Sequence, residues 1–301
     1  MGNVFYFAWE IGLMQWLQAH IAPAWMAFIS QLSLPGEDLF LVMVLGFVYW
    51  CRDKKLGQRI GWCLLLGSSW SLALKDIVQR LRPYFVSDGI ELLRKIDSGA
   101  DTHDIAKQGF AFPSGHSFNV TAVFGTLAVA TKKKWLTVLA VVLPLLVGFS
   151  RVAVGAHFPT DVFAGWMMGL LVVWLVPFLQ RALRYPRVFR IVALLSAAPG
   201  LFFCTGAAYY TSFGLLLGLA LSEPFEAKFV RFAPAKGFWR SLLRLAGGIA
   251  VYLVVNALLK LPFSADFLEQ ATTLSYLVRA ARYAIVSFIA IGVYPLAFKK
   301  I

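Results

Sequence analysis

The sequence predicts an all-α, polytopic membrane helix bundle, and three observations support this fold class. Apolar residues make up 59% of the 301 residues, whereas soluble domains average about 45–50%. The mean hydropathy is +0.72, and only 14% of the residues are charged. Basic residues form short clusters between long apolar runs, so the net charge of +13 indicates membrane topology and not a nucleic-acid partner.

The opening residues and the cysteines exclude two further classes of protein. The stretch MGNVFYFAWEIG lacks the basic leader and the small-residue cleavage site of a secretory signal, so we expect the first apolar segment to remain. Cys51, Cys63 and Cys204 are scattered through apolar sequence without C-x-x-C spacing. They indicate neither a disulfide framework nor a zinc site, and we interpret them as packing residues.

Ten helices are predicted from apolar runs long enough to cross about 30 Å of hydrocarbon. In order, they cover residues 6–33, 36–50, 57–81, 114–131, 135–152, 160–180, 189–206, 208–222, 240–260 and 279–298. The first run is long and carries Glu10, so an interfacial half-helix followed by a span is an alternative. The second and eighth runs are short enough to be re-entrant.

The distribution of Lys and Arg orients the predicted bundle, because basic connections favour the cytoplasmic side. Basic clusters follow helices two, four, six and eight, and a basic pair ends the chain: Arg52, Lys54, Lys55, Arg59; Lys132, Lys133, Lys134; Arg181, Arg184, Arg187, Arg190; Lys228, Arg231, Lys236, Arg240; Lys299, Lys300. Both termini are then cytoplasmic. The connections 82–113, 152–159 and 261–278 are expected on the extracytoplasmic side.

Three polar clusters interrupt the apolar sequence, and all of them fall on the predicted extracytoplasmic side. In the first, KDIVQRLRP, Lys75 and Arg82 are seven residues apart, close to two helical turns. Both side chains therefore project from one side of a helix, which Pro83 ends.

The second and third clusters lie at the starts and ends of later helices. In FAFPSGHSFNV, the residues Pro113, Ser114 and Gly115 start a helix whose free N–H groups and positive dipole end favour an anion. In SRVAVGAHFPTD, Ser150 and Arg151 close a helix. A turn with His157 follows, and Asp161 opens the next helix.

The residue types in these clusters point to a phosphate ligand. Ionisable residues at membrane depth are costly and are usually functional. Lys75, Arg82 and Arg151 supply positive charge, and the helix that starts at Ser114 supplies N–H donors. Asp161 is four residues from His157, near enough to hold one ring nitrogen and present the other as a nucleophile.

These clusters resemble the motifs of the type 2 phosphatidic acid phosphatase superfamily, an integral membrane family with a vanadium haloperoxidase-like catalytic core. The motifs are K-x6-R-P, P-S-G-H and S-R-x5-H-x3-D, which here run from Lys75 to Pro83, from Pro113 to His116 and from Ser150 to Asp161. The resemblance covers about residues 1–180 and implies a six-helix phosphatase core.

The resemblance also implies a role for each motif residue. His157 would form a phosphohistidine, Asp161 would orient it, and His116 would protonate the leaving group and then activate water. The residues expected to hold the phosphoryl oxygens are Lys75, Arg82, Ser114, Gly115 and Arg151. Pro83, Pro113 and Ser150 complete the motifs, with a less defined role for Ser150. No metal and no cofactor are expected.

Residues 181–301 add about four transmembrane helices that the motifs do not need, and we treat 1–180 and 181–301 as two domains. The extension is expected to serve packing, homodimerisation or selection of the lipid chain. The long polar connection 84–112 is expected to gate the site or contact a head group.

A membrane lipid phosphatase that cleaves a phosphomonoester or a pyrophosphate is the favoured function. A non-catalytic lipid-phosphate binder or transporter is the alternative. The lipid stays open among undecaprenyl diphosphate, phosphatidylglycerol phosphate, phosphatidic acid and sphingoid phosphates, because all four offer the same reacting group.

Overall fold

The structure is a computed structural model that describes residues 2–94 and 101–299, and within these ranges it is all-α. The helices are α1 (Ala8–His20), α2 (Pro23–Gln31), α3 (Asp38–Phe47), α4 (Lys54–Val78), α5 (Pro83–Val86), α6 (Ile105–Gln108), α7 (Gly115–Thr131), α8 (Lys134–Ala153), α9 (Pro159–Ala182), α10 (Pro186–Ala197), α11 (Gly200–Phe203), α12 (Ala207–Phe225), α13 (Phe238–Leu258), α14 (Ala265–Glu269) and α15 (Thr273–Phe288). Among the described residues, extended pairing is limited to one isolated parallel bridge between Asn3 and Arg80.

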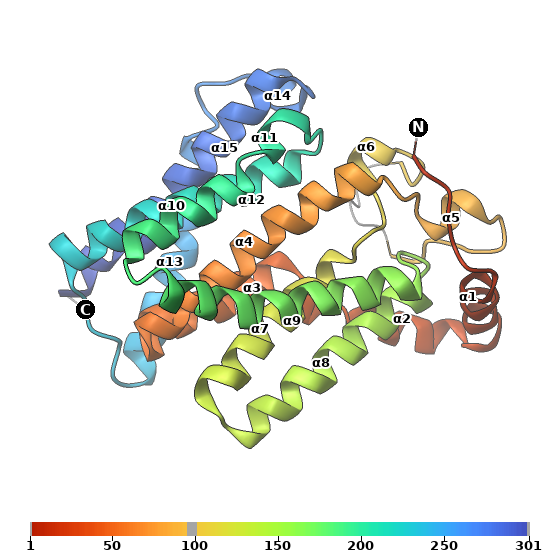
Figure 1. Cartoon of the computed structure of the whole chain (residues 1–301), viewed down its shortest axis with the longest axis horizontal. Helices are drawn as coiled ribbons and strands as arrows, with labels where there is room; N and C mark the ends of the chain where they lie inside the picture. The colour runs from red at the N-terminus through yellow and green to blue at the C-terminus, as the bar shows by residue number, and fades with distance from the viewer. Residues whose placement is uncertain (1, 95–100, 300–301) are drawn as a thin grey trace. The chain divides into compact units, whose positions relative to one another are not determined.

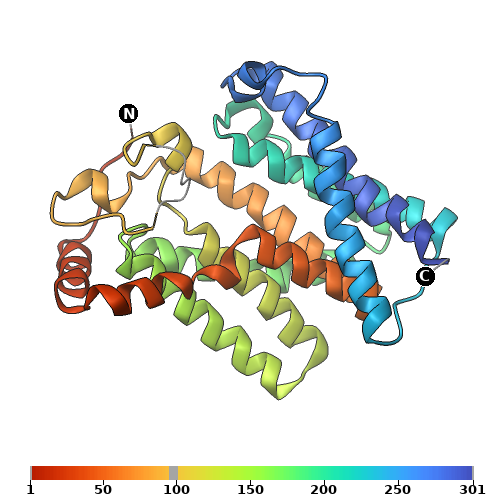
Figure 2. The same cartoon turned by 180° about the vertical axis from the view of Figure 1, so that it is seen from behind.

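All ten predicted segments are helical, but the first is divided in two. The chain leaves helical geometry at Ile21, and Pro23 starts α2. Figure 2 shows α1 and α2, both in red, running in different directions. This is the geometry of the half-helix alternative. Proline explains the break, because it has no N–H to donate and therefore suits the first turn of a new helix.

Several helices are long and apolar enough to cross a membrane. Over the described residues there are five, or six if the pair Pro23–Gly36 and Asp38–Arg52, bent by 44°, forms one broken span. The five are Lys134–Ala153, Pro159–Ala182, Pro186–Phe203, Phe238–Leu258 and Thr273–Phe298. The prediction of a multi-pass helical membrane protein is thus confirmed.

The chain forms two compact units that alternate along the sequence. The first unit contains residues 1–41 and 71–173, and the second contains residues 42–70 and 174–301. The division into domains 1–180 and 181–301 stays a prediction.

In the first unit, α7 and α8 form an antiparallel hairpin (Figure 1). Helices α7 and α9 approach closely because α9 carries glycines against α7. A Cβ atom at Gly165 would lie 3.0 Å from the Ser117 Cβ, and one at Gly169 would lie 2.6 Å from the Thr121 Cβ. The close contact brings the start of α9 to the start of α7, where the Ser114 N–H donates to the Asp161 carbonyl at 2.9 Å.

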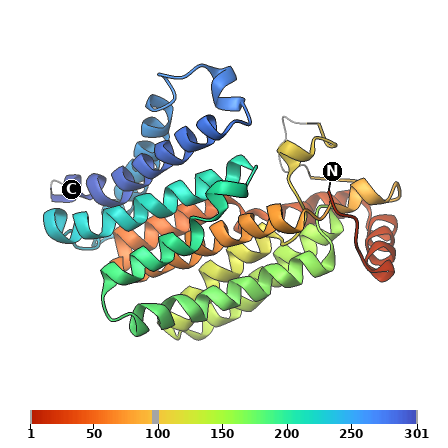
Figure 3. The same cartoon turned by 45° about the horizontal axis from the view of Figure 1, so that its top comes forward.

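The second unit is organised around α12 and α15, which pack along their length (Figure 3, teal and blue). Its aromatic core includes Tyr49, Trp50 and Phe232. A buried carboxylate, Glu226, forms an ion pair with Lys54 at 2.9 Å. An apolar cavity of about 100 Å³ lies between the helices of this unit.

Candidate active site

The three motifs come together within the first unit, at the ends of its helices. Lys75 lies in the last turn of α4, and Arg82 precedes α5, whose first residue is Pro83. Ser114 precedes α7, Arg151 lies in the last turn of α8, and Asp161 lies in the first turn of α9. His157 lies in the short connection between α8 and α9. Helix ends and the connections beside them therefore deliver the charged groups. The prediction that Lys75 and Arg82 project from one side of a helix that Pro83 ends is wrong, because α4 ends at Val78 and Gln79 has a left-handed backbone with a φ of 53°.

Arg82 links two loops of the site. Its Nε donates to the carbonyls of Gln108 at 3.1 Å and Gly109 at 2.8 Å, and its Nη2 donates to Gln108 at 2.8 Å. Its Nη1 donates to the Ala156 carbonyl at 2.8 Å. Burial lowers the pKa of Arg82 to about 10. The positive charge is therefore held away from water, and a bound anion would stabilise it.

The contact between Arg82 and His157 assigns the proton positions on the imidazole. Arg82 Nη1 lies 3.3 Å from His157 Nε2. A guanidinium donates hydrogen bonds and does not accept them, so Nε2 carries the lone pair and the neutral ring has its proton on Nδ1. Nδ1 faces Asp161 Oδ2 at 3.7 Å, which is longer than a hydrogen bond. This is the orientation that a nucleophilic Nε2 requires.

The environment keeps the imidazole of His157 neutral. Its side chain is 2% exposed. Burial lowers the pKa of His157 well below its usual range, and the positive charges of Arg82, Lys75 and Arg151 lower it further. A neutral imidazole at neutral pH has the free electron pair that attack on phosphorus needs.

Lys75 forms hydrogen bonds to main-chain carbonyls. Its ammonium donates to three carbonyls of the segment before α7, those of Phe110 at 3.0 Å, Ala111 at 3.2 Å and Pro113 at 2.6 Å. These bonds anchor the start of α7. The sequence could not identify these acceptors, because main-chain carbonyls leave no pattern in the residue types. The phosphate contact expected of Lys75 stays a prediction.

The start of α7 also has local contacts of its own. The Ser117 hydroxyl donates to Ser114 Oγ at 3.0 Å, and a cis peptide bond joins Phe112 and Pro113. By helix geometry, the N–H groups of Gly115 and His116 have no intrahelical acceptor. They can therefore donate to an anion in front of the helix.

Gly36, in the bend between α2 and α3, presses against His116. A Cβ atom at this glycine would lie 3.0 Å from the Cβ and from the carbonyl oxygen of His116. A larger residue would therefore push the backbone that carries the predicted proton donor.

Buried donors without partners are concentrated at this site. Within the part of the chain that the structure describes, nine buried side-chain atoms lack a hydrogen-bond partner. Five of them belong to four residues near the motifs: Arg151 Nε and Nη2, Ser150 Oγ, His157 Nδ1 and Tyr84 Oη. Unpaired buried polar groups are costly, so a cluster of them indicates a ligand-binding site. The donors are cationic or neutral, which suits a phosphate.

A network that the motifs do not contain supports Asp161. Arg80 Nη1 donates to Asp161 Oδ1 at 2.6 Å and to Thr160 Oγ1 at 2.7 Å, and its Nη2 donates to Glu10 Oε2 at 2.9 Å. Sequence reasoning missed Arg80, Thr160 and Tyr84 as site residues. The one available signal was Glu10, a carboxylate in an apolar segment.

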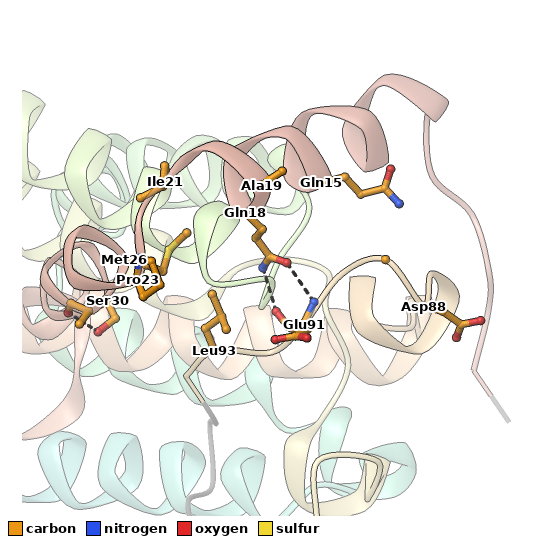
Figure 4. Close-up of a pocket in the computed structure, with 12 residues that line it drawn as sticks. Gln15, Gln18, Ala19, Ile21, Pro23, Met26, Ser30, Asp88, Glu91 and Leu93 are labelled. Atoms are coloured by element: carbon orange, nitrogen blue, oxygen red, sulfur yellow. Dashed lines mark hydrogen bonds between the residues drawn. The ribbon is translucent and has the colours of Figure 1, made fainter.

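A cavity lies in the first unit, against the segment that contains α1 and α2. It has a volume of about 610 Å³ and is lined by residues of α1, α2 and the connection 88–93, and none of the predicted site residues lines it. Figure 4 shows Gln18 reaching across it to the main chain of Glu91. The Gln18 amide donates to the carbonyls of Glu91 at 2.9 Å and Ala153 at 3.1 Å. The expected gating role of the connection 84–112 stays a prediction.

Among the described residues, no group of three or more His, Cys, Asp or Glu side chains could hold a metal ion. The charged groups that the motifs bring to this part of the protein include the cations Lys75, Arg82 and Arg151.

The helices and the buried cations define a multi-pass membrane protein with a cationic site. A profile of the PAP2 superfamily matches residues 57–185, and one described as "PAP2 superfamily phosphatase, transmembrane extension" matches residues 210–301. The chain belongs to the PAP2 superfamily, which confirms the family that the motifs resemble.

Several characterised proteins are similar to this chain. Phosphatidylglycerophosphatase B of Bacillus subtilis is 34% identical over 165 residues, which cover 50% of this chain and 71% of that protein. Undecaprenyl-diphosphatase of Sulfolobus acidocaldarius is 41% identical over 144 residues, which cover 48% and 64%. Sphingosine-1-phosphate phosphatase 2 of Mus musculus is 28% identical over 170 residues, which cover 54% and 43%. The chain thus spans less than two thirds of the latter two proteins.

Two solved structures are also similar. The crystal structure of Aquifex aeolicus LpxE has a TM-score of 0.49 at 21% identity, covering 60% of this chain and 97% of that one. A transmembrane PAP2 type phosphatidylglycerolphosphate phosphatase from Bacillus subtilis has a TM-score of 0.45 at 25% identity, covering 58% and 86%.

Proposed function

We propose that this chain is a membrane lipid phosphatase that hydrolyses a phosphomonoester or a pyrophosphate through a phosphohistidine at His157. The observation that carries the proposal is the set of unpartnered buried donors of Arg151, Ser150 and Tyr84. A phosphoryl group provides acceptor oxygens and negative charge for such a set. The named relatives, which are all lipid phosphatases, support the same class of reaction.

The proposed reaction has two steps. His157 Nε2 attacks phosphorus, an N–P bond forms, the P–O bond to the lipid breaks, and the leaving oxygen takes a proton from His116. Water then attacks phosphorus and gives its proton to His116. The N–P bond breaks, which releases inorganic phosphate. Arg82, Arg151 and the N–H groups at the start of α7 would stabilise the charge on the phosphoryl oxygens.

Phosphate release from the detergent-solubilised protein tests the proposal. Wild type should release phosphate from a lipid phosphate, and His157→Ala should lose nearly all turnover. His20→Ala is the matched control, because His20 is exposed and its contacts in the described part of the chain are with its own helix, at the Trp16 carbonyl and ring. Equal rates for wild type and His157→Ala would refute the mechanism. No release from any lipid phosphate, with lipid phosphate still bound, would support the non-catalytic binder or transporter instead.

The lipid substrate is best identified with a panel. The relatives are named for phosphatidylglycerophosphate, undecaprenyl diphosphate and sphingosine-1-phosphate. We propose that the substrate is one of these lipids or phosphatidic acid. Parallel measurement of kcat/KM for the four lipids ranks them as substrates. Equal values for all four would argue against selectivity for one lipid phosphate.

We place the site at the extracytoplasmic face. In the first unit, the site lies at the start of α7 and the end of α8, whereas the basic turn Lys132–Lys134 joins their other ends. The 17 residues of α7 separate the two by about 25 Å, and the basic turn favours the cytoplasm.

Labelling of introduced cysteines tests this orientation. Asp88 and Lys133 are both exposed, whereas the native cysteines are buried. An impermeant thiol reagent should label Asp88→Cys in intact cells and should label Lys133→Cys only after permeabilisation. The reverse pattern would invert the topology.

A further inference from the structure

We propose that Arg80 and Glu10 are positioning residues, which fix the carboxylate of Asp161 and balance the charge of the phosphorylated His157. This inference rests on the proposed function of His157. Arg80, Glu10 and Asp161 are buried, with exposures of 2%, 0% and 0%. Arg80 occupies one of the six unspecified positions of the first motif, and Glu10 lies outside all three motifs.

Each oxygen of the Asp161 carboxylate is held by a different donor. Oδ1 accepts from Arg80 Nη1 at 2.6 Å, and Oδ2 accepts from the Phe158 N–H at 2.8 Å. These two hydrogen bonds, one to each oxygen, hold the carboxylate in place. Oδ2 is also the oxygen that faces His157 Nδ1. Arg80 therefore acts on His157 through Asp161 and not by direct contact.

Glu10 holds Arg80 in place from the other side. One of its oxygens accepts from Arg80 Nη2 at 2.9 Å and from the Phe7 N–H at 2.9 Å. The other accepts from the Thr160 N–H at 3.0 Å and from the Thr160 hydroxyl at 2.6 Å. All four acceptor sites of this carboxylate are thus used, and a buried ionised carboxylate needs such partners.

The guanidinium itself is enclosed. Its centre lies 4.1 Å from the Phe158 ring centroid and 4.8 Å from that of Phe5, and its Nε donates to the Phe5 carbonyl at 2.9 Å. Aromatic faces on this cation exclude water from the pair with Asp161. The fixed fork of Arg80 can therefore engage two carboxylates at once, which a lysine cannot do.

The charges of the network fit the proposed intermediate. Two carboxylates surround one guanidinium, which leaves one negative charge in the cluster. Attack by Nε2 converts the neutral imidazole of His157 into a phosphorylated imidazolium with its proton on Nδ1, toward Asp161. The surplus negative charge then faces a new positive charge, whose formation it favours.

Steady-state kinetics of network variants test the inference. For Arg80→Met, kcat should fall about 10- to 100-fold, the effect of losing a hydrogen bond to a charged group, and KM should stay within about threefold. Arg80→Lys should recover part of this loss. Glu10→Gln keeps the shape and removes the charge, so its kcat should fall about tenfold. An unchanged kcat for Glu10→Gln would refute the charge-balancing role.

A double-mutant cycle separates positioning from a general structural role. Because Arg80 acts through Asp161, Arg80→Met combined with Asp161→Asn should be no slower than Asp161→Asn alone. Multiplied losses would overturn the inference, and so would a raised KM with unchanged kcat. If Arg80→Met does not fold, the Glu10→Gln and Asp161→Asn pair gives the same cycle.

The matched control is Glu226→Gln, which changes a buried, ion-paired carboxylate in the other unit. Its kcat should equal that of wild type. If His157→Ala is inactive while Arg80→Met keeps the wild-type kcat, the inference fails and the proposed function stands. If His157→Ala keeps the wild-type rate, the proposed function fails first.

Discussion

Replacement of Arg82 and replacement of Arg151 should have opposite effects on the free energy of unfolding, although both residues are expected to bind phosphate. The Arg82 guanidinium donates to the carbonyls of Gln108, Gly109 and Ala156. Arg151 is 1% exposed, and its Nε and Nη2 have no acceptor in the described part of the chain. The first cation therefore links loops through its hydrogen bonds, whereas the second has donors available for a ligand.

The magnitudes follow from these contacts. A hydrogen bond to a charged group contributes about 1.5–3 kcal/mol, so Arg82→Met should lower the free energy of unfolding by at least about 3 kcal/mol. An unsatisfied buried donor costs about 1–3 kcal/mol, so Arg151→Met should raise it by about 2 kcal/mol or more. Methionine retains most of the aliphatic packing of the arginine stem.

Thermal unfolding in detergent measures both effects, at about 2–4 °C for each kcal/mol. The midpoint should fall for Arg82→Met and rise for Arg151→Met, while phosphate release is lost in both. Inorganic phosphate at 100 times its Kd should add about 2.7 kcal/mol to wild type and nothing to Arg151→Met. A lowered midpoint for Arg151→Met would show that this cation is already satisfied in the free protein, and the reasoning would be refuted.

Two further predictions concern pH and metal ions. Because burial and neighbouring cations lower the pKa of His157, the nucleophile stays neutral as the pH falls through 6.5. The acid limb of kcat/KM, corrected for the ionisation of the substrate, should therefore lie below pH 6.5, and a limb at or above this value would contradict the assignment. EDTA should leave phosphate release unchanged if, as we propose, Arg82 and Arg151 supply the charge stabilisation. Loss on chelation that magnesium restores would disprove this.

The sequence predicted most of the convergence because each motif is short and lies at a predicted helix end. Arg151 and Asp161 flank one short connection, as expected. The shared helix face predicted for Lys75 and Arg82 was wrong, because α4 ends at Val78 and the chain turns at Gln79. Because the helices cross the membrane in alternate directions, the helix ends that carry the motifs lie on the same side of the membrane. The motifs are therefore expected to lie close together on that side.

The supporting contacts could not be predicted in the same way. Glu10 bonds Arg80 across 70 positions and Thr160 across 150 positions. No periodicity links such distant residues. The acceptors of Lys75 and Arg82 are main-chain carbonyls, which depend on loop conformation and not on residue type. Gly36 gives no chemical signal, because its role is only to leave room for His116.

The network around Glu10 sets a lower limit on how far this protein can be trimmed. The segment 57–185 that matches the superfamily profile contains every motif residue but not Glu10. A chain cut to that segment would leave Arg80 Nη2 and the Thr160 N–H without their acceptor, at about 1–3 kcal/mol each. The smallest unit that carries the motifs is therefore smaller than the smallest unit that carries a complete site.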